Sequence, residues 1–178
     1  KNQGKILMKD SYWDAYNIAA IYGDYASITA GTRSIYDVAN DHTEADIALV
    51  EKKLKEMKPN LAGWEADFGK EMMTKGRIWL SYAWSGDAVW AIEEAAEVDV
   101  SLDYIVPNEG SNIWFDGWVI PKYARNVKAA SYFLAYLCQP DVALRNMDVS
   151  GYTSAVATPE IIDAMVDSTI TETSNLSY

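Results

Sequence analysis

The chain has 178 residues, 49% of them hydrophobic and 23% charged, which is the composition of a globular protein and excludes a disordered one. Acidic residues outnumber basic ones by 26 to 15, so the net charge of −11 has the wrong sign for a protein that neutralises nucleic-acid phosphates. No apolar run approaches the roughly 20 residues of a membrane-spanning helix, and the start at Lys1 without a methionine indicates a processed or trimmed polypeptide.

Short strands and helices are expected to alternate through the first half of the chain. We predict a strand over 5–9, a helix from Ser11 toward Gly23, a loop or short helices over 24–42, and a helix over 43–60. Ser11 and Asp14 have the S-x-x-D spacing of a capping box, in which the serine side chain caps the first turn of a helix. Pro59 cannot continue a helix and predicts the end of the second one.

The second half continues this alternation. We predict strands over 76–86, 103–107 and 113–121, and helices over 87–98, 126–138, 140–150 and 158–166. Pro140 stands at a first helical position, which proline favours. Among the tryptophans, Trp79 and Trp90 are expected in the core. Strands separated by helices predict an α/β fold with a mostly parallel central sheet flanked by helices.

The stretch IWFDGWVIP, residues 113–121, places an acid between two tryptophans. Side chains alternate between the two faces of a strand, so Trp114, Asp116 and Trp118 are predicted to share one face. A buried carboxylate is costly unless it has a cationic partner or several hydrogen bonds. This mixture on one face therefore indicates a cleft that is open to a ligand.

Two other predicted strand ends carry similar residues, and open α/β sheets bind ligands at the carboxyl ends of their strands. Asp10, Ser11 and Asp14 follow the first strand, and Trp84 closes the strand over 76–86. Indole faces attract ammonium groups, at about 0.5–2 kcal/mol for each contact, and carboxylates pair with the same groups. The sequence therefore favours a ligand that is an amine with an apolar body.

Three segments carry a resemblance to a known family: GRIWLSYAWSGDAVWA from Gly76, YIVPNEGSNIWFDGWVIPKYARNVKAASYFLAYLCQPDVA from Tyr104, and SGYTSA from Ser150. Their motifs are, in order, a Trp-x-Gly strand end, a P-x-E-G turn, a W-x-D strand, a P-D-V-A helix and a Gly-Tyr segment. This ordered series resembles the second half of the spermidine/putrescine-binding proteins, the solute-binding components of bacterial polyamine ABC importers.

The resemblance implies ligand-binding roles for particular residues. Trp84 and Trp114 would pack along the polyamine chain, Asp116 would pair with one of its amines, and Tyr152 would contribute a hydroxyl or a ring edge. Each of these residues matches the corresponding family motif in type and position.

Around the first helix, Ser11 and Asp14 fall where the family commonly has acids that bind the other amine. The sequence departs from the family pattern here, because Ser11 replaces an acid and Trp13 stands where a basic residue is common. Because of these departures, the family pattern alone does not fix the length of the ligand or the number of amines that are recognised.

The resemblance also implies the type 2 periplasmic-binding-protein fold, which has two α/β lobes, and this chain would hold an incomplete part of it. Residues 1–113 would form most of the second lobe. Residues 114–155 would form a crossover strand and a helical excursion that belong to the first lobe, and residues 156–178 would return to the second lobe.

Such proteins work outside the cytoplasmic membrane, either in the periplasm or attached to the outer face of that membrane. The resemblance implies two partners, a polyamine or related linear amine and the permease subunits of an ABC transporter. It implies membrane contact only through the permease or an anchor outside this chain. It implies neither enzymatic activity nor a cofactor or metal.

Other interpretations stay open. A protein of the same fold could bind iron through Tyr82, Tyr152 and Asp116, or could bind another small solute. Paired carboxylates could serve an α/β hydrolase of glycosides, although the sequence has no G-x-S-x-G, P-loop or G-x-G-x-x-G motif. Cys138 is predicted as the buried end of a helix and His42 as part of a polar stretch, so a Cys–His pair is disfavoured.

Overall fold

The computed structural model describes residues 4–166, and the chain divides into two compact units. The first unit takes in the residues up to Trp84 together with Ala91–Ile113. The second takes in Ser85–Trp90 and the residues from Trp114 onward. Each unit is described by itself below.

A small parallel sheet forms the centre of the first unit. Its strands are β1 (Ile6–Lys9), β2 (Leu61–Glu65) and β3 (Leu80–Ser81), in the order β2-β1-β3. Both neighbours run parallel to β1, and Leu7 pairs with Gly63 on one side and with Ser81 on the other. Leu7 and Met8 are buried, as expected for a central strand with both faces covered. The predicted α/β fold with a parallel sheet is confirmed.

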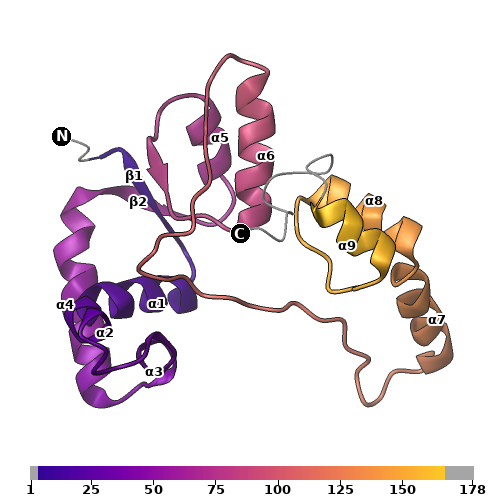
Figure 1. Ribbon diagram of the computed structural model, residues 1–178, viewed down its shortest axis with the longest axis horizontal. Coiled ribbons are helices and arrows are strands. Elements are labelled where there is room, and N and C mark those ends of the chain that lie inside the picture. Colours follow the sequence, from indigo (N-terminus) through magenta and orange to yellow (C-terminus); the bar gives the residue numbers. More distant parts are fainter. Residues whose placement is uncertain (1–3, 167–178) are drawn as a thin grey trace. The chain divides into compact units, whose positions relative to one another are not determined.

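Several helices of the first unit accompany the sheet (Figure 1). They are α1 (Tyr12–Gly23), α2 (Tyr25–Thr29), α3 (Ile35–Asn40), α4 (Glu44–Met57), the 3₁₀ turn η1 (Lys58–Asn60) and α5 (Gly69–Thr74). Helices α1 and α5 contact the strands of the sheet, while α2, α3 and α4 contact α1. Helix α6 (Ser85–Ala96) follows β3 along the chain, and its residues are divided between the two units. The predicted helices after Ser11 and after residue 43 are thus confirmed, and two short helices occupy the stretch 24–42.

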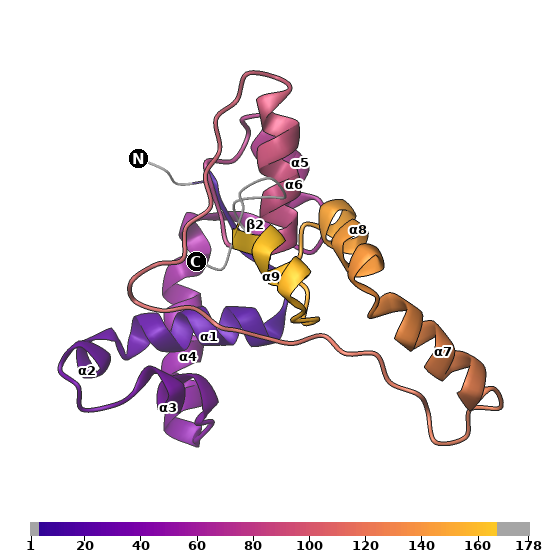
Figure 2. The ribbon, with the colours of Figure 1, turned by 45° about the vertical axis from the view of Figure 1, so that its right-hand side comes forward.

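Helix α1 packs against α4, and Figures 1 and 2 both show the two side by side. The apolar core here combines Ala19, Ala20 and Ile21 of α1 with Val38 of α3 and Val50 of α4. Gly23 permits the close approach, because a Cβ atom there would lie 3.0 Å from the Leu49 side chain. The Thr43 and Asp46 side chains form a reciprocal capping box that fixes where α4 begins.

Three helices make up most of the second unit: α7 (Val127–Leu137), α8 (Pro140–Ser150) and α9 (Pro159–Val166). Helices α8 and α9 lie side by side in Figure 2 and share a core of Ala143, Met147, Ile161 and Met165. Pro140 begins α8, as predicted, and Gly151 ends it in the left-handed conformation with φ of 72°. The predicted segment 156–178 extends past Val166 and so lies partly outside the described residues.

Several predictions about strands were wrong. Residues 103–107 and 113–121 are not strands, because a strand requires hydrogen bonds to a neighbour and the described residues provide none for them. Instead of a two-faced strand, 113–121 is an extended segment in which Phe115 is 86% exposed. The strand over 76–86 is reduced to Leu80–Ser81, whereas β2 and α5 had not been predicted.

Two predictions of burial were also wrong. Trp79 is 62% exposed and lies just before β3, with the Lys5 ammonium group 5.8 Å from the centroid of its ring. Cys138 is exposed at the carboxyl end of α7. Trp90 is half-buried. Within residues 4–166, no helix combines the length and the apolar character needed to cross a bilayer.

Candidate functional site

The carboxyl ends of the three strands bring several polar side chains together in the first unit. Lys9 ends β1, Glu65 ends β2, and Tyr82 and Trp84 follow β3. Parallel strands present these ends at one edge of the sheet, which is the usual ligand-binding edge of open α/β sheets. We call the following residues the strand-end cluster: Lys9, Asp14, Glu65, Tyr82, Trp84 and Asn112.

Asp14 lies at the centre of the strand-end cluster and is only 8% exposed. Its Oδ2 accepts a hydrogen bond from the indole Nε1–H of Trp84 at 3.0 Å, and its Oδ1 accepts one from the Asn112 amide at 2.8 Å. Ser11 caps α1 as predicted, because its hydroxyl accepts the backbone N–H of Asp14 at 3.5 Å. The Asp14 carboxylate is therefore turned toward Trp84 and Asn112.

Tyr82 extends this hydrogen-bonded chain. Its hydroxyl donates to Oδ1 of Asn112 at 2.8 Å, so the Asn112 amide links the phenol to the Asp14 carboxylate. Burial raises the pKa of Tyr82, and the negative charge of Asp14 raises it further. Both effects favour the neutral phenol and disfavour a tyrosinate ligand for iron at this position.

Lys9 is buried in the same cluster, with only 1% of its surface exposed. Its ammonium group lies 3.4 Å from Oε1 of Glu65, donates to the Ala66 carbonyl at 2.6 Å, and lies 3.8 Å from the centroid of the Trp84 ring. The other oxygen of Glu65, Oε2, accepts the backbone N–H of Gly69 at 2.9 Å. This buried ion pair is thus supported by further hydrogen bonds, as such pairs require.

The cluster has the chemistry of a cation site. An ionised carboxylate has about four positions at which it can accept hydrogen bonds, and the two bonds to Asp14 use two of them. Both donors are neutral groups, so they orient the carboxylate without cancelling its charge. The indole beside it offers a second attraction for an ammonium group.

A cavity of about 640 Å³ lies elsewhere in the first unit, between α1, α4 and β2. Ser11 lines this cavity and not the strand-end cluster, together with the aromatic side chains of Trp13, Tyr16 and His42. The His42 ring packs edge-on against Tyr16, at 4.9 Å between centroids. The structure thus brings Asp14 and Trp84 into contact while the Ser11 side chain lies along a largely apolar wall.

The remaining predicted site residues belong to the second unit. Trp114 is 41% exposed and Asp116 is exposed, both on the extended segment 113–121. Tyr152 follows α8, and its ring lies so close to Gly86 that a Cβ atom there would be 2.2 Å from Cε2. A role for these three residues in binding a ligand stays a prediction.

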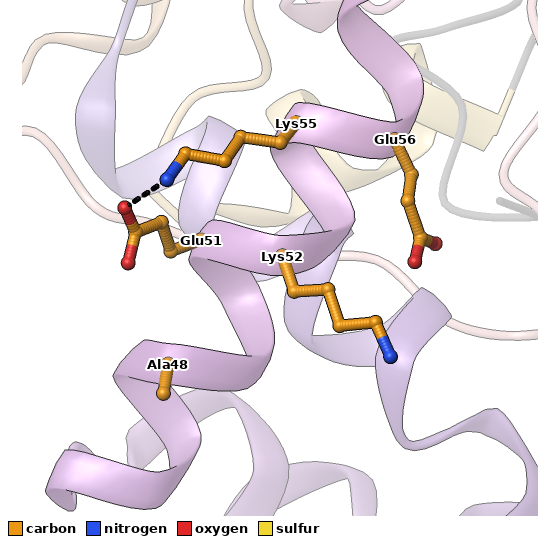
Figure 3. A pocket seen from close by; sticks show the side chains of 5 residues that line it. All are labelled: Ala48, Glu51, Lys52, Lys55 and Glu56. Carbon is orange, nitrogen blue, oxygen red and sulfur yellow. Dashed lines mark hydrogen bonds and ion pairs between the residues drawn. The ribbon is translucent and has the colours of Figure 1, made fainter.

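A second depression, of about 380 Å³, lies on the outer surface of α4 (Figure 3). It is bordered by charged side chains, among them Lys55, which forms an ion pair with Glu51 one turn away. The hydrogen bond from Lys55 lowers the pKa of Glu51, and the positive charge of Lys55 lowers it further. Such i,i+4 pairs are ordinary features of a solvated helix face, and the depression is no candidate for a functional site.

Among the residues that the structure describes, no three His, Cys, Asp or Glu side chains gather closely enough to hold a metal ion. His42 lies in the first unit and Cys138 in the second.

Sequence reasoning missed Lys9, Glu65 and Asn112. Lys9 carried one usable signal, since it ends an otherwise apolar strand that the parallel sheet would bury. Asn112 lies just after the P-x-E-G turn and had no signal of its own. Glu65 belongs to β2, which had not been predicted.

Comparisons with known proteins show the family to which the chain belongs. Residues 1–169 match the sequence profile of the family described as "Bacterial extracellular solute-binding protein". The "Spermidine/putrescine-binding periplasmic protein" of Escherichia coli K12 is 26% identical over 150 residues, which are 84% of this chain and 38% of that protein. The "Putrescine-binding periplasmic protein PotF" of the same organism is 31% identical over 125 residues, 68% of this chain and 33% of that protein.

Solved structures support the fold. A "Putative spermidine/putrescine ABC transporter" from Listeria monocytogenes has a TM-score of 0.72 at 28% identity, covering 92% of this chain and 45% of that one. The spermidine/putrescine substrate-binding protein PotD of Streptococcus pneumoniae has a TM-score of 0.65 at 24% identity, which concerns the fold alone. The chain spans less than half the length of each of these proteins. The resemblance drawn from the sequence motifs is confirmed.

Proposed function

Because the chain belongs to the family of bacterial extracellular solute-binding proteins, we propose that it is part of the solute-binding component of an ABC importer and captures a polyamine. The observation that carries this proposal is the buried Asp14 carboxylate, held between the Trp84 indole and the Asn112 amide at the carboxyl ends of the strands. The relatives of this chain are named for spermidine and putrescine, which are linear amines of this kind.

The charge of the chain and of the cluster both suit such a ligand. A net charge of −11 attracts cations over long range. At short range, Asp14 would pair with an ammonium group, and the Trp84 indole would cover the methylene groups next to it. The hydrogen bonds that already orient Asp14 and Trp84 mean that little side-chain freedom remains to be lost on binding.

We also propose the residues that the sequence motifs indicate. Trp114 would pack along the amine chain, Asp116 would pair with an ammonium group, and Tyr152 and Ser11 would add polar contacts. These assignments rest on the match in residue type and order to the family motifs. The Ser11 side chain would have to reach the ligand from its place on the wall of the aromatic cavity.

The division into lobes is part of the same proposal. Residues 1–113 would form most of the second lobe, 114–155 the excursion into the first lobe, and 156–178 the return. The protein would work outside the cytoplasmic membrane and deliver its ligand to the permease subunits of the transporter.

Calorimetry on the full-length protein that carries this chain tests the proposal. We expect binding of putrescine or spermidine, and a loss of at least about tenfold in affinity for Asp14→Asn, which keeps the shape and removes the charge. Asp141→Asn is the matched control, since Asp141 is an exposed acid paired with Arg145 on α8. If neither amine binds to the wild-type protein, the proposed function is wrong. If Asp14→Asn binds as tightly as wild type, Asp14 is not part of the site.

A further inference from the structure

The proposed function puts an ammonium group of the ligand beside Trp84, and the protein's own Lys9 ammonium group already lies beside that ring. Its ammonium group lies 3.8 Å from the Trp84 ring centroid, well within the approximately 6 Å over which an indole attracts a cation. The side chain is almost completely buried, so this position is fixed by its surroundings. Glu65 and the Ala66 carbonyl hold the same ammonium group from other directions.

The indole of Trp84 has three surfaces that can take part in recognition: two ring faces and the N–H edge. The N–H edge is used by Asp14, at 3.0 Å. One ring face is used by Lys9. A ligand ammonium that approaches this tryptophan must therefore use the other face, and it does so within the field of the Lys9 charge.

We infer that Lys9 is a specificity-determining residue whose ammonium group replaces one ammonium group of the ligand, so that the strand-end cluster selects a short diamine over a longer triamine. This inference rests on the proposed function. Asp14 would pair with one terminal ammonium group of the ligand. A triamine would have to bring a further ammonium group close to Lys9. Like charges that lie close together in a poorly solvated site repel strongly.

A purely structural role for Lys9 predicts a different result. If Lys9 serves only to neutralise Glu65, its removal lowers the stability of the protein and weakens every ligand to a similar extent. If Lys9 sets specificity, its removal changes the ratio of the two affinities. The affinity ratio therefore separates the two roles, even in a variant that is less stable.

The test measures calorimetric affinities for putrescine, a diamine, and spermidine, a triamine, on the full-length protein. Lys9→Met removes the charge and keeps the length of the side chain, and it leaves Glu65 available to a ligand ammonium. Lys9→Met/Glu65→Gln removes both charges, so that no unpaired carboxylate is buried. The matched control is Lys5→Met, because Lys5 also lies over an indole, at 5.8 Å from Trp79, outside the strand-end cluster.

We expect Lys9→Met to raise the ratio of spermidine affinity to putrescine affinity by about tenfold. The double variant should raise this ratio by a smaller factor, because it frees the Trp84 ring face but also removes the Glu65 carboxylate. Lys5→Met should leave the ratio as in wild type. If Lys9→Met does not fold, the double variant decides the matter.

Other outcomes overturn the inference in distinguishable ways. An unchanged ratio in both Lys9 variants, with both amines still bound, refutes the role of Lys9 and leaves the proposed function intact. If Lys5→Met changes the affinity ratio as much as Lys9→Met does, the change is a general effect of removing a positive charge, and the role of Lys9 is refuted. Failure of wild type and all variants to bind either amine refutes the proposed function and this inference together.

Discussion

The indole N–H of Trp84 donates a hydrogen bond to Oδ2 of Asp14 at 3.0 Å, although 70 positions separate the two residues in the sequence. This bond joins the start of α1 to the segment that follows β3. It also fixes the orientation of both side chains that we propose to bind an amine. The stability of the first unit and the geometry of the candidate site therefore depend on the same contact.

Replacing Trp84 with phenylalanine tests this contact directly. Trp84→Phe keeps an aromatic ring for Lys9 and removes the donor to Asp14, which is buried. We expect a loss of about 1–2 kcal/mol in the free energy of unfolding, the usual effect of leaving a buried acceptor short of a donor. Denaturant unfolding of the variant measures this loss. Trp118→Phe, at an exposed ring, should change stability little, and equal losses in both variants would contradict the importance of the bond.

Asn112 should be as important as Trp84, because its side chain has two partners. Its amide donates to Asp14 at 2.8 Å and its carbonyl accepts from Tyr82 at 2.8 Å. Asn112→Ala removes both bonds, and we expect a loss of about 2–3 kcal/mol. Asn108→Ala, four residues earlier at an exposed position, is the control. A variant at Asn112 that is as stable as the control would show that the linked bonds contribute nothing to stability.

The residues of the strand-end cluster differ in how far the sequence could predict them. Asp14 and Trp84 were predicted from motifs at the ends of strands, and the structure places them in contact. Sequence gave no indication that Asn112 completes the cluster, and the one signal for Lys9, its place at the end of an apolar strand, had not been used. Asn112 lies in a loop, where periodicity carries no information, and lysine is rarely buried. Both are positioned by tertiary contacts that act across long separations.

Helices were easier to predict than strands, because helix signals are local in the sequence whereas strands depend on contacts with distant segments. The pattern of α4 and the proline at the start of α8 are local signals, and both helices form where these signals indicate. A strand depends on its neighbours as well as on its own residues. The alternation over 113–121 predicted a strand, yet the described residues provide no neighbour for it. In contrast, β2 forms despite Gly63, because β1 lies beside it.

The ion pairs around Arg33 give the first unit a pH dependence. Arg33 lies 2.8 Å from Oδ1 of Asp46 and also pairs with Asp24 and Asp41. The hydrogen bond from Arg33 is the main cause that lowers the pKa of Asp46 to about 2. A carboxylate with a lowered pKa stabilises the folded state above its unfolded pKa of about 3.9, and this contribution is lost as the pH falls through the folded value.

We therefore expect Asp46→Asn to lower the melting temperature at pH 6 and to have a diminishing effect as the pH falls from about 4 toward 2. Thermal unfolding followed by circular dichroism at several pH values measures this. Asp148→Asn, an exposed position on α8, should show no such trend. A difference between Asp46→Asn and wild type that is the same at pH 6 and pH 2 would exclude the linkage.

Gly151 is required by the turn that follows α8. It has φ of 72°, and a Cβ atom there would lie 3.0 Å from Val89 and 3.1 Å from the Gly86 carbonyl. Gly151→Ala should thus destabilise the protein by about 1–2 kcal/mol through backbone strain and crowding. Gly63→Ala is the control, since a Cβ atom at that position meets no described atom within 4 Å. Equal melting temperatures for the two variants would contradict this assignment.

Asp116 offers the cleanest separation of binding from stability. It is exposed, so that Asp116→Asn should leave the melting temperature without ligand as in wild type. If Asp116 pairs with an ammonium group, as we propose, the same variant should bind putrescine or spermidine at least about tenfold more weakly by calorimetry. Asp14→Asn should lower both affinity and stability, because Asp14 is buried and accepts two hydrogen bonds. Asp148→Asn, the control, should change neither affinity nor stability. If Asp116→Asn also changes neither, Asp116 does not bind the ligand, and the proposed role of Asp14 is unaffected.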